Sequence, residues 1–516
     1  MQSPLDFWKS QSLNSKRFLL ICLVLSFVMH AITAIYSYGF YLFDEHYQII
    51  EFAWMKLGHS NLKNMAWEYQ SMSRPTLQPW IAIVIFKVLG MTNPFKMAFV
   101  LRLITSILGF ASLIPFCLLG MQWNKNELLR KVFPFLLATL PIIAFVHARF
   151  SSEGFGCIFL LWGICFLLIS YTLEIKNKSA KVYMYLFLAG ASFAVAFVCR
   201  IQIALAFPGI FIWAYFIDKL QFKKIVIIGV AMLFVILLSA ILDRLYYGIW
   251  VNSLWLYFKI NFIDGKANSF GKLPFFFYFK EIISKLGFIW GWLFILTMLI
   301  GWIRKPLNIF TLAFVPYFIF HCFFGHKEIR FLFPMVCIIP LFIVFAFDGI
   351  KNFNFNSLPK GVKIAGWLML IFYIFSDIVW ISDTCFSPAR IEFYAYKYLD
   401  EYRNVPLTIV SLYDEEWPYG PDDHMNMDFY KQRNLITKYH KPDETQLRQI
   451  ADTSKFPVYL YCTANEVTPP SVLLKSGVPY FLEYKSLPDW VLTIKSWHII
   501  DLQPVVLVYR VGGKSI

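Results

Sequence analysis

Long apolar stretches separated by short polar connections occupy the first three quarters of the chain. Eleven of these stretches are long enough to cross a bilayer as helices. They lie near residues 18–41, 98–120, 132–147, 154–172, 181–199, 201–217, 225–242, 286–303, 307–323, 331–347 and 363–381. A shorter apolar run at 77–90 begins among Pro75 and Pro79, so we expect an interfacial helix there rather than a span. The pattern predicts an all-α polytopic membrane protein.

Composition and charge support this prediction and give it an orientation. Of the 516 residues, 58% are hydrophobic and 15% are charged, whereas a soluble domain has about a quarter charged residues. The net charge of +15 would suit nucleic acid, but the basic residues lie between apolar segments rather than in one patch. With a cytoplasmic N-terminus and eleven spans, the basic clusters fall in cytoplasmic connections, as the positive-inside rule requires. These clusters are Lys125/Arg130/Lys131, Lys176/Lys178/Lys181, Lys219/Lys223/Lys224, Arg304/Lys305 and Lys351/Lys360.

The same topology places the remaining polar segments on the extracytoplasmic face. They are residues 42–76, 148–153, 243–285, 324–330 and the tail from 382 onward. We therefore expect a membrane domain over 1–381, with a first outer loop at 42–76, and any chemistry on its outer face.

Residues 382–516 differ in character from the membrane domain. Short β-like runs occur at 407–411, 458–461 and 505–509, and a helix-like stretch occurs at 442–452. This alternation predicts a small extracytoplasmic α/β domain.

The first outer loop carries a dense group of polar residues. Asp44 and Glu45 are adjacent carboxylates next to His46, which makes them candidates for a general base. Equally, Asp44 is well placed as the N-cap of a helix. Gln48 and Arg74 belong to the same loop and are candidates for a binding cleft, although the surrounding aromatic residues also fit a headgroup belt.

Further polar residues lie at outer turns between spans. Arg149 and Glu153 either pair with each other or contact a ligand, and Arg200 with Gln202 lies at a tight turn. A guanidinium at a membrane face binds phosphate in a bidentate way, or it extends to lipid headgroups. Tyr247 ends the seventh span, and it is followed by an aromatic run at 275–279 that predicts an interfacial helix or the wall of a lipid-tail groove.

Residues 326–331, His-Lys-Glu-Ile-Arg-Phe, place four ionisable side chains within five positions. Short charged loops are common, but charge this dense beside apolar segments usually serves a function. Lys327 and Arg330 supply cationic charge and His326 a hydrogen-bond donor. Together the outer segments offer a carboxylate pair and several cations, which suits a lipid-linked phosphate. The nine cysteines show no zinc-type spacing, and we expect neither a metal nor a cofactor.

The motifs Asp44-Glu-His-Tyr-Gln48, Arg149…Glu153, Asp243-Arg-Leu-Tyr-Tyr-Gly248 and His326-Lys-Glu-Ile-Arg-Phe331 resemble those of the GT-C glycosyltransferases. The resemblance is to the polyprenyl- or dolichyl-phosphate-mannose-dependent mannosyltransferases of family 22, in which a late loop reads His-Lys-Glu-x-Arg-Phe. It covers roughly residues 18–347.

The resemblance implies a GT-C fold and an inverting transfer of a sugar, often mannose, from a polyprenyl-phosphate donor to a glycan or glycolipid acceptor. It places the catalytic base on Asp44, with Glu45 as its neighbour. Arg200, His326, Lys327 and Arg330 would hold the donor phosphate. His46, Gln48, Arg74, Arg149, Glu153, Gln202 and Tyr247 would line the donor and acceptor cleft.

Two other functions remain open: a flippase or transporter for lipid-linked glycans, and a non-catalytic membrane assembly subunit. A transporter would need charged residues deep in several spans, and the spans here carry few. The one Asn-x-Ser/Thr sequon, at Asn177, falls in a predicted cytoplasmic connection. This favours a bacterial inner membrane, with the endoplasmic reticulum as the alternative, and an active site on the periplasmic or lumenal face.

Overall fold

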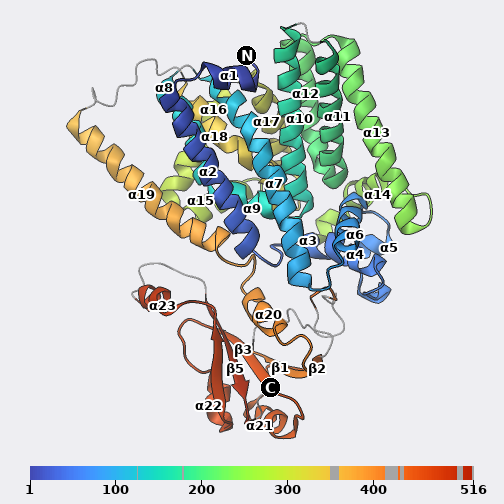
Figure 1. Cartoon of the computed structure of the whole chain (residues 1–516), viewed down its shortest axis with the longest axis vertical. Helices are drawn as coiled ribbons and strands as arrows, with labels where there is room; N and C mark the ends of the chain where they lie inside the picture. The colour runs from blue at the N-terminus through green and yellow to red at the C-terminus, as the bar shows by residue number, and fades with distance from the viewer. Residues whose placement is uncertain are drawn as a thin grey trace. The chain divides into compact units, whose positions relative to one another are not determined.

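The computed structural model describes residues 1–124, 126–176, 179–348, 359–412, 428–430, 435–496 and 504–513 (Figure 1). Lys125, Asn177, Lys178 and Lys351, which were named above, lie outside these ranges. Contacts divide the chain into two compact units. Unit 1 comprises Met1–Ser37, Trp67–Ile85 and Phe99–Phe386, and unit 2 comprises Tyr38–Ala66, Phe86–Ala98 and Ser387–Ile516.

Among the described residues of unit 1, all the regular secondary structure is helical. Its elements are α1 (Pro4–Ser10), α2 (Leu13–Tyr36), α5 (Trp67–Gln70), α6 (Leu77–Leu89), α7 (Pro94–Gly120), η3 (Met121–Trp123), α8 (Glu127–Thr139), α9 (Pro141–Ala148), α10 (Ser152–Glu174), α11 (Ser179–Cys199), η4 (Ile201–Ala206), α12 (Phe207–Ile212), η5 (Trp213–Ile217), α13 (Phe222–Tyr247), α14 (Ser253–Phe258), η6 (Lys259–Ile263), η7 (Lys266–Phe270), α15 (Phe277–Leu286), α16 (Phe288–Arg304), α17 (Ile309–Phe323), η8 (Ile329–Ile338), α18 (Ile339–Phe347) and α19 (Lys360–Cys385). Helices α6 and α7 each continue into unit 2.

The helices follow the apolar windows of the sequence. Among the described residues, seven helical segments are long and apolar enough to cross a membrane, and α8 with α9 forms a further, bent pair at 48°. Pro141 begins α9, and because proline cannot donate a hydrogen bond, it separates α9 from α8. Shorter apolar helical segments occupy 201–217, 288–304 and 309–323. Each of the eleven predicted windows therefore coincides with a helical segment, and the predicted helix at 77–90 is α6.

Small residues allow the helices of unit 1 to approach closely. Helix α11 packs between α10 and α13 (Figure 1). A Cβ added at Gly190 of α11 would lie 2.3 Å from the carbonyl oxygen of Ile228 in α13. At Gly209 of α12, an added Cβ would lie 1.9 Å from the carbonyl oxygen of Leu312 in α17. Close backbone contact across small residues is a common way for helices to associate in lipid.

Unit 2 contains the C-terminal sheet and the outer-loop segments. Its elements are α3 (Phe43–Glu45), η1 (His46–Ile50), α4 (Glu51–Lys56), η2 (Leu62–Asn64), α20 (Phe393–Asp400), β1 (Leu407–Ser411), β2 (Leu435–His440), α21 (Glu444–Thr453), β3 (Val458–Ala464), α22 (Ser471–Ser476), β4 (Tyr480–Lys485), α23 (Asp489–Ser496) and β5 (Val505–Val511). The predicted β runs correspond to β1, β3 and β5, and the predicted helix at 442–452 corresponds to α21, so these four predictions are confirmed.

The sheet has strand order β2-β1-β3-β5-β4. Strand β1 runs parallel to β2 and β3, whereas β5 runs antiparallel to β3 and β4. One face of the sheet packs on α21 and α22, and the other packs on α20. The central strands are covered on both faces, which is consistent with their mostly apolar sequences.

The first outer loop shares the core of unit 2. The backbone N–H of Ala389 donates to the carbonyl oxygen of Tyr38 over 2.8 Å. The ring of Phe40 lies 5.2 Å from that of Phe393, centroid to centroid. Gly39 has a φ of 80°, and a Cβ there would lie 2.4 Å from the Phe393 ring. The segment from 38 to 56 is therefore held by α20 and residues 428–430.

The contact at Gly209 yields a prediction about stability. Gly209→Ala places a methyl group against the Leu312 carbonyl, so α12 and α17 must separate, and overpacking of this kind costs about 1–3 kcal/mol. We expect a lower apparent melting temperature in detergent. Gly229→Ala in α13 is the matched control, because an added Cβ there meets nothing within 4 Å. Equal melting temperatures for the two variants would contradict the close contact between α12 and α17.

Candidate functional site

Glu153 is placed by the start of α10. The side chain of Ser151 caps this helix by accepting from the backbone N–H of Gly154 over 3.0 Å. Glu153 follows in the first turn, where a carboxylate is favoured by the helix dipole. The side chain is 3% exposed, so its charge needs partners within the protein.

Two arginines meet this carboxylate. Arg200 Nη1 lies 3.1 Å from Glu153 Oε1, and Arg330 Nη1 lies 3.5 Å from the same oxygen. Arg200 stands at the break between α11 and η4, and Arg330 stands at the start of η8. Both are buried, and both guanidinium groups contact the ring of Phe331, at 4.9 Å and 5.6 Å from its centroid. We call Glu153, Arg200 and Arg330 the arginine cluster.

Glu328 extends this cluster. Its Oε1 accepts from Arg330 Nη2 over 2.8 Å, and its Oε2 forms an ion pair with Arg330 Nε at 2.8 Å. His326 Nε2 lies 3.0 Å from Oε1. Burial alone would raise the pKa of Glu328, but the hydrogen bond to His326 and the charge of Arg330 lower it to about 2. Glu328 is therefore an ionised carboxylate that orients Arg330.

Lys327 contacts backbone carbonyl oxygens rather than a carboxylate. Its ammonium donates to the carbonyl oxygen of Leu273 over 2.7 Å and to that of Phe324. The side chain therefore ties the segment before α15 to the end of α17. Its predicted role in phosphate binding has no support from these contacts.

Arg200 retains hydrogen-bonding capacity. Its Nη2 is buried without a hydrogen-bond partner among the described residues. Gln202 Nε2 donates to the Tyr257 hydroxyl over 3.2 Å, while Gln202 Oε1 also lacks a described partner. Arg74 lies over the same Tyr257 ring, 5.3 Å from its centroid. The side chains of Arg74, Arg200 and Gln202 thus converge around Tyr257 and Phe331.

The loop that carries Arg74 is fixed by the end of α13. Asp243 Oδ1 accepts from both the backbone N–H and the hydroxyl of Thr76, each over 2.7 Å. The Tyr247 hydroxyl donates to the Arg74 carbonyl oxygen over 2.8 Å. Helix α13 then ends at Gly248, which has a left-handed φ of 83° that suits glycine. Tyr247 therefore positions the backbone of Arg74.

The unused hydrogen-bonding capacity of this region favours an anion. Glu153 and Glu328 hold Arg200 and Arg330 in place, and Arg200 still has a guanidinium N–H without a hydrogen-bond partner among the described residues. Guanidinium groups bind phosphate or carboxylate oxygens with short, charge-assisted hydrogen bonds. The geometry therefore suits an anionic group such as a phosphate.

The adjacent carboxylates of the first outer loop belong to unit 2. Glu45 is buried, and its Oε2 accepts from the backbone N–H of Tyr41 over 3.0 Å. Asp44 is half-buried in the single turn α3. Of the two carboxylates, Asp44 is the more accessible to a ligand.

His46 is part of the unit 2 core. It is 1% exposed and stacks on the rings of Phe40 and Tyr430. Its Nε2 lies 2.8 Å from Glu51 Oε1, which also accepts from the backbone N–H of Phe429 over 2.9 Å. These contacts make His46 a structural residue rather than a cleft residue. Gln48 is likewise buried, at 6% exposed.

Glu51 is a buried carboxylate that sequence reasoning missed. Burial raises its pKa, an effect that the hydrogen bond from His46 opposes. The backbone N–H of Glu51 bonds to the carbonyl oxygen of His46, so residues 46–50 form a π turn that brings positions five apart together. If the loop formed an α-helix, the side chains of His46 and Glu51 would not face each other. No pattern in the sequence indicates the π turn.

The structure brings some predicted site residues together and not others. Glu153, Arg200, His326 and Arg330 form one network, with Arg74 and Gln202 beside it. Arg149 instead donates to the backbone and hydroxyl oxygens of Ser37 and lies over the Phe145 ring. Its contacts therefore link α9 to the end of α2, and Glu153 pairs with Arg200 and Arg330.

Comparisons with known proteins place these features in a family. The model of the Alg9-like mannosyltransferase family matches residues 18–408. The chain is 29% identical over 256 residues to a probable Dol-P-Man:Man(7)GlcNAc(2)-PP-Dol alpha-1,6-mannosyltransferase of Schizosaccharomyces pombe. The matched stretch covers 48% of this chain and 42% of that relative. It is 24% identical over 377 residues to Mannosyltransferase APTG1 of Arabidopsis thaliana. This match covers 68% of this chain and 62% of that relative. The chain thus spans less than two thirds of the length of either relative.

A solved structure shares the fold. The crystal structure of ArnT from Cupriavidus metallidurans bound to undecaprenyl phosphate superposes with a TM-score of 0.52 and 11% identity, over 95% of this chain and 97% of that one. The arrangement of apolar helices with a small sheet is therefore the GT-C fold that the motifs led us to expect. Because the family model covers most of the chain, including all the residues of the arginine cluster, the protein belongs to the Alg9-like mannosyltransferase family.

Proposed function

We propose that this protein is a membrane mannosyltransferase that moves a mannosyl residue from a polyprenyl-phosphate donor to a glycan or glycolipid acceptor, with inversion. The arginine cluster carries this proposal, because it presents an unused guanidinium N–H of Arg200 in a buried, charged setting. Family membership and the names of the two relatives support the sugar. The name of the Schizosaccharomyces pombe relative also supports a lipid-linked donor.

Arg200 and Arg330 act on the donor phosphate in this proposal. As the bond between the anomeric carbon and the phosphate oxygen breaks, negative charge collects on the departing lipid phosphate. Guanidinium groups that are already held in place by Glu153 and Glu328 stabilise this charge without reorganising. His326 contributes by fixing Glu328.

Asp44 acts as the general base on the acceptor. It takes the proton of the acceptor hydroxyl as the oxygen forms its bond to the anomeric carbon on the face opposite the phosphate. One C–O bond forms and one breaks, the proton passes to Asp44, and the polyprenyl phosphate leaves. Glu45, held by the Tyr41 backbone, positions the turn that carries Asp44.

We place this reaction on the extracytoplasmic face. The positive-inside distribution of lysine and arginine supports this orientation. A bacterial inner membrane is the location we favour, with the periplasm as the site of transfer, and the lumen of the endoplasmic reticulum is the alternative.

The assignment of the base leads to a prediction. Asp44→Asn removes the proton acceptor, so transfer from a radiolabelled polyprenyl-phosphate mannose should fall by about 10²-fold or more. Glu45→Gln should cost less, because its carboxylate contacts the backbone. Asp489→Asn, at an exposed site in α23, serves as the control. Full activity of Asp44→Asn in properly inserted protein would remove Asp44 from the mechanism.

The role of Arg200 leads to a second prediction. Arg200→Lys keeps one positive charge but loses the planar donor pair, so kcat should fall by about 10²-fold. Arg304→Lys makes the same chemical change at an exposed position of α16 and should leave kcat unchanged. If both variants keep wild-type kcat, the arginine cluster does not stabilise the leaving group.

Glu328 leads to a prediction about pH. Its folded pKa of about 2 lies below the usual value of 4.5, so the stability from its charge is present above about pH 4.5 and is lost as pH falls toward 2. Glu328→Gln should therefore lower the apparent melting temperature at pH 7, and the difference from wild type should shrink as pH falls below about 4. A difference that stays constant over this pH range would contradict the ionised network.

Transport of lipid-linked glycans is the competing function. Proteoliposomes that contain the protein should transfer mannose to an acceptor, and they should not translocate a fluorescent lipid-linked glycan without transfer. Translocation in the absence of any transfer would favour the transporter.

A further inference from the structure

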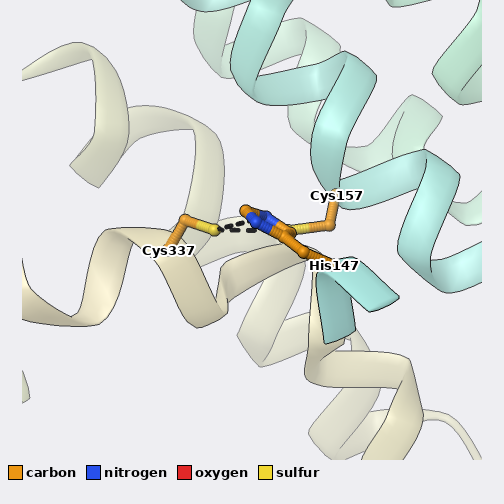
Figure 2. Close-up of side chains that lie close together, drawn as sticks. All are labelled: His147, Cys157 and Cys337. Carbon is orange, nitrogen blue, oxygen red and sulfur yellow. Dashed lines mark hydrogen bonds between the residues drawn. The ribbon is translucent and has the colours of Figure 1, made fainter. Parts of the chain in front are cut away.

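Three potential metal ligands meet in the interior of unit 1. The side chains of His147, Cys157 and Cys337 point toward one another (Figure 2). They come from α9, α10 and η8, and each is at most 1% exposed. Among the described residues, they are the one group of three or more such side chains with donor atoms all within 4.8 Å of one another.

The donor atoms have the separations that a tetrahedral metal ion requires. Cys337 Sγ lies 3.1 Å from His147 Nε2 and 3.6 Å from Cys157 Sγ, and Cys157 Sγ lies 4.0 Å from His147 Nε2. Tetrahedral zinc bonds of about 2.3 Å to sulfur and 2.0 Å to nitrogen separate two sulfurs by about 3.8 Å, and sulfur from nitrogen by about 3.5 Å. Only shifts of a few tenths of an ångström are needed to place an ion among them.

A hydrogen-bond chain prepares His147 for this role. His30 Nδ1 lies 2.7 Å from the carbonyl oxygen of Ser26, and His30 Nε2 lies 3.0 Å from His147 Nδ1. Because a carbonyl only accepts, His30 Nδ1 carries the proton, and neutral His30 then accepts at Nε2 from His147 Nδ1. This leaves the lone pair of His147 Nε2 directed at the two sulfurs. Metal-binding histidines are oriented by this kind of second hydrogen bond.

The charges of the three ligands favour a divalent metal ion. Two thiolates, one neutral imidazole and one divalent cation sum to zero, which suits a site buried among apolar helices, whereas a monovalent ion would leave a net negative charge. Thiolate and imidazole ligands exclude Mg²⁺ and Ca²⁺, which prefer oxygen. Three protein ligands leave one coordination position, which a water fills in zinc sites of this type.

We propose that His147, Cys157 and Cys337 bind one zinc ion. Binding converts both thiols to thiolates and releases two protons. The ion joins α9, α10 and η8, and two of these elements also carry Glu153 and Arg330. The proposal is independent of the transferase function, since it concerns metal content and stability.

Metal analysis of the full-length protein, purified in detergent with a reductant after growth with zinc, tests the proposal. We expect about one zinc per chain, and a value below about 0.1 for Cys157→Ser and Cys337→Ser. Cys165→Ser is the matched control, because Cys165 is another buried free cysteine of α10, outside the cluster. It should keep the zinc of the wild type.

A second measurement covers the case in which the cysteine variants fail to fold. Wild-type protein stripped with a chelator should lose apparent thermal stability, regain it with Zn²⁺, and show thiolate-to-metal absorption bands with Co²⁺. Folded wild type that holds no zinc after supplementation would overturn the proposal. So would equal zinc in wild type and Cys157→Ser, or a Cys157–Cys337 disulfide found by mass spectrometry in freshly alkylated membranes.

Discussion

Two guanidinium groups share the buried carboxylate of Glu153 in the interior of unit 1. Arginine cannot give up its proton in a protein, so Arg200 and Arg330 keep their charges wherever the helices carry them. Removing one partner from such a buried group is strongly destabilising, because it leaves an uncompensated charge. Glu153 therefore determines how α10, the α11–η4 break and η8 come together. Glu328 and Phe331 complete the surroundings of the two arginines.

Local patterns in the sequence were enough to identify the helices, the main strands and the charged motif. Hydropathy located the apolar helices because a bilayer demands long apolar segments. The β-like runs at 407–411, 458–461 and 505–509 predicted strands, and the structure places them as β1, β3 and β5 in a sheet that is covered on both faces. The motif at 326–331 was recognisable because its charge density contrasts with its flanks. The motif did not show that its residues have different partners. Lys327 donates to backbone carbonyls, whereas Glu328 accepts from Arg330.

Other features depend on contacts that no local pattern contains. His46 meets Glu51 only because residues 46–50 form a π turn, and Phe429 and Tyr430 cover the pair. Pairing of Arg149 with Glu153 was one of two alternatives for these residues, but a helix start intervenes and Arg149 contacts Ser37. Cys157 and Cys337 are 180 positions apart, so spacing rules for metal sites do not apply to them.

The shared core of unit 2 has a consequence for how such proteins can be recombined. The segment that bears Asp44 is packed by α20 and by Phe429 and Tyr430, which lie more than 340 residues later in the chain. A chimera that exchanged only the C-terminal domain with a relative would replace the aromatic residues that pack against the segment 38–56. Functional hybrids must therefore inherit residues 38–56 and the C-terminal domain from the same parent, which makes the two segments a single unit of inheritance.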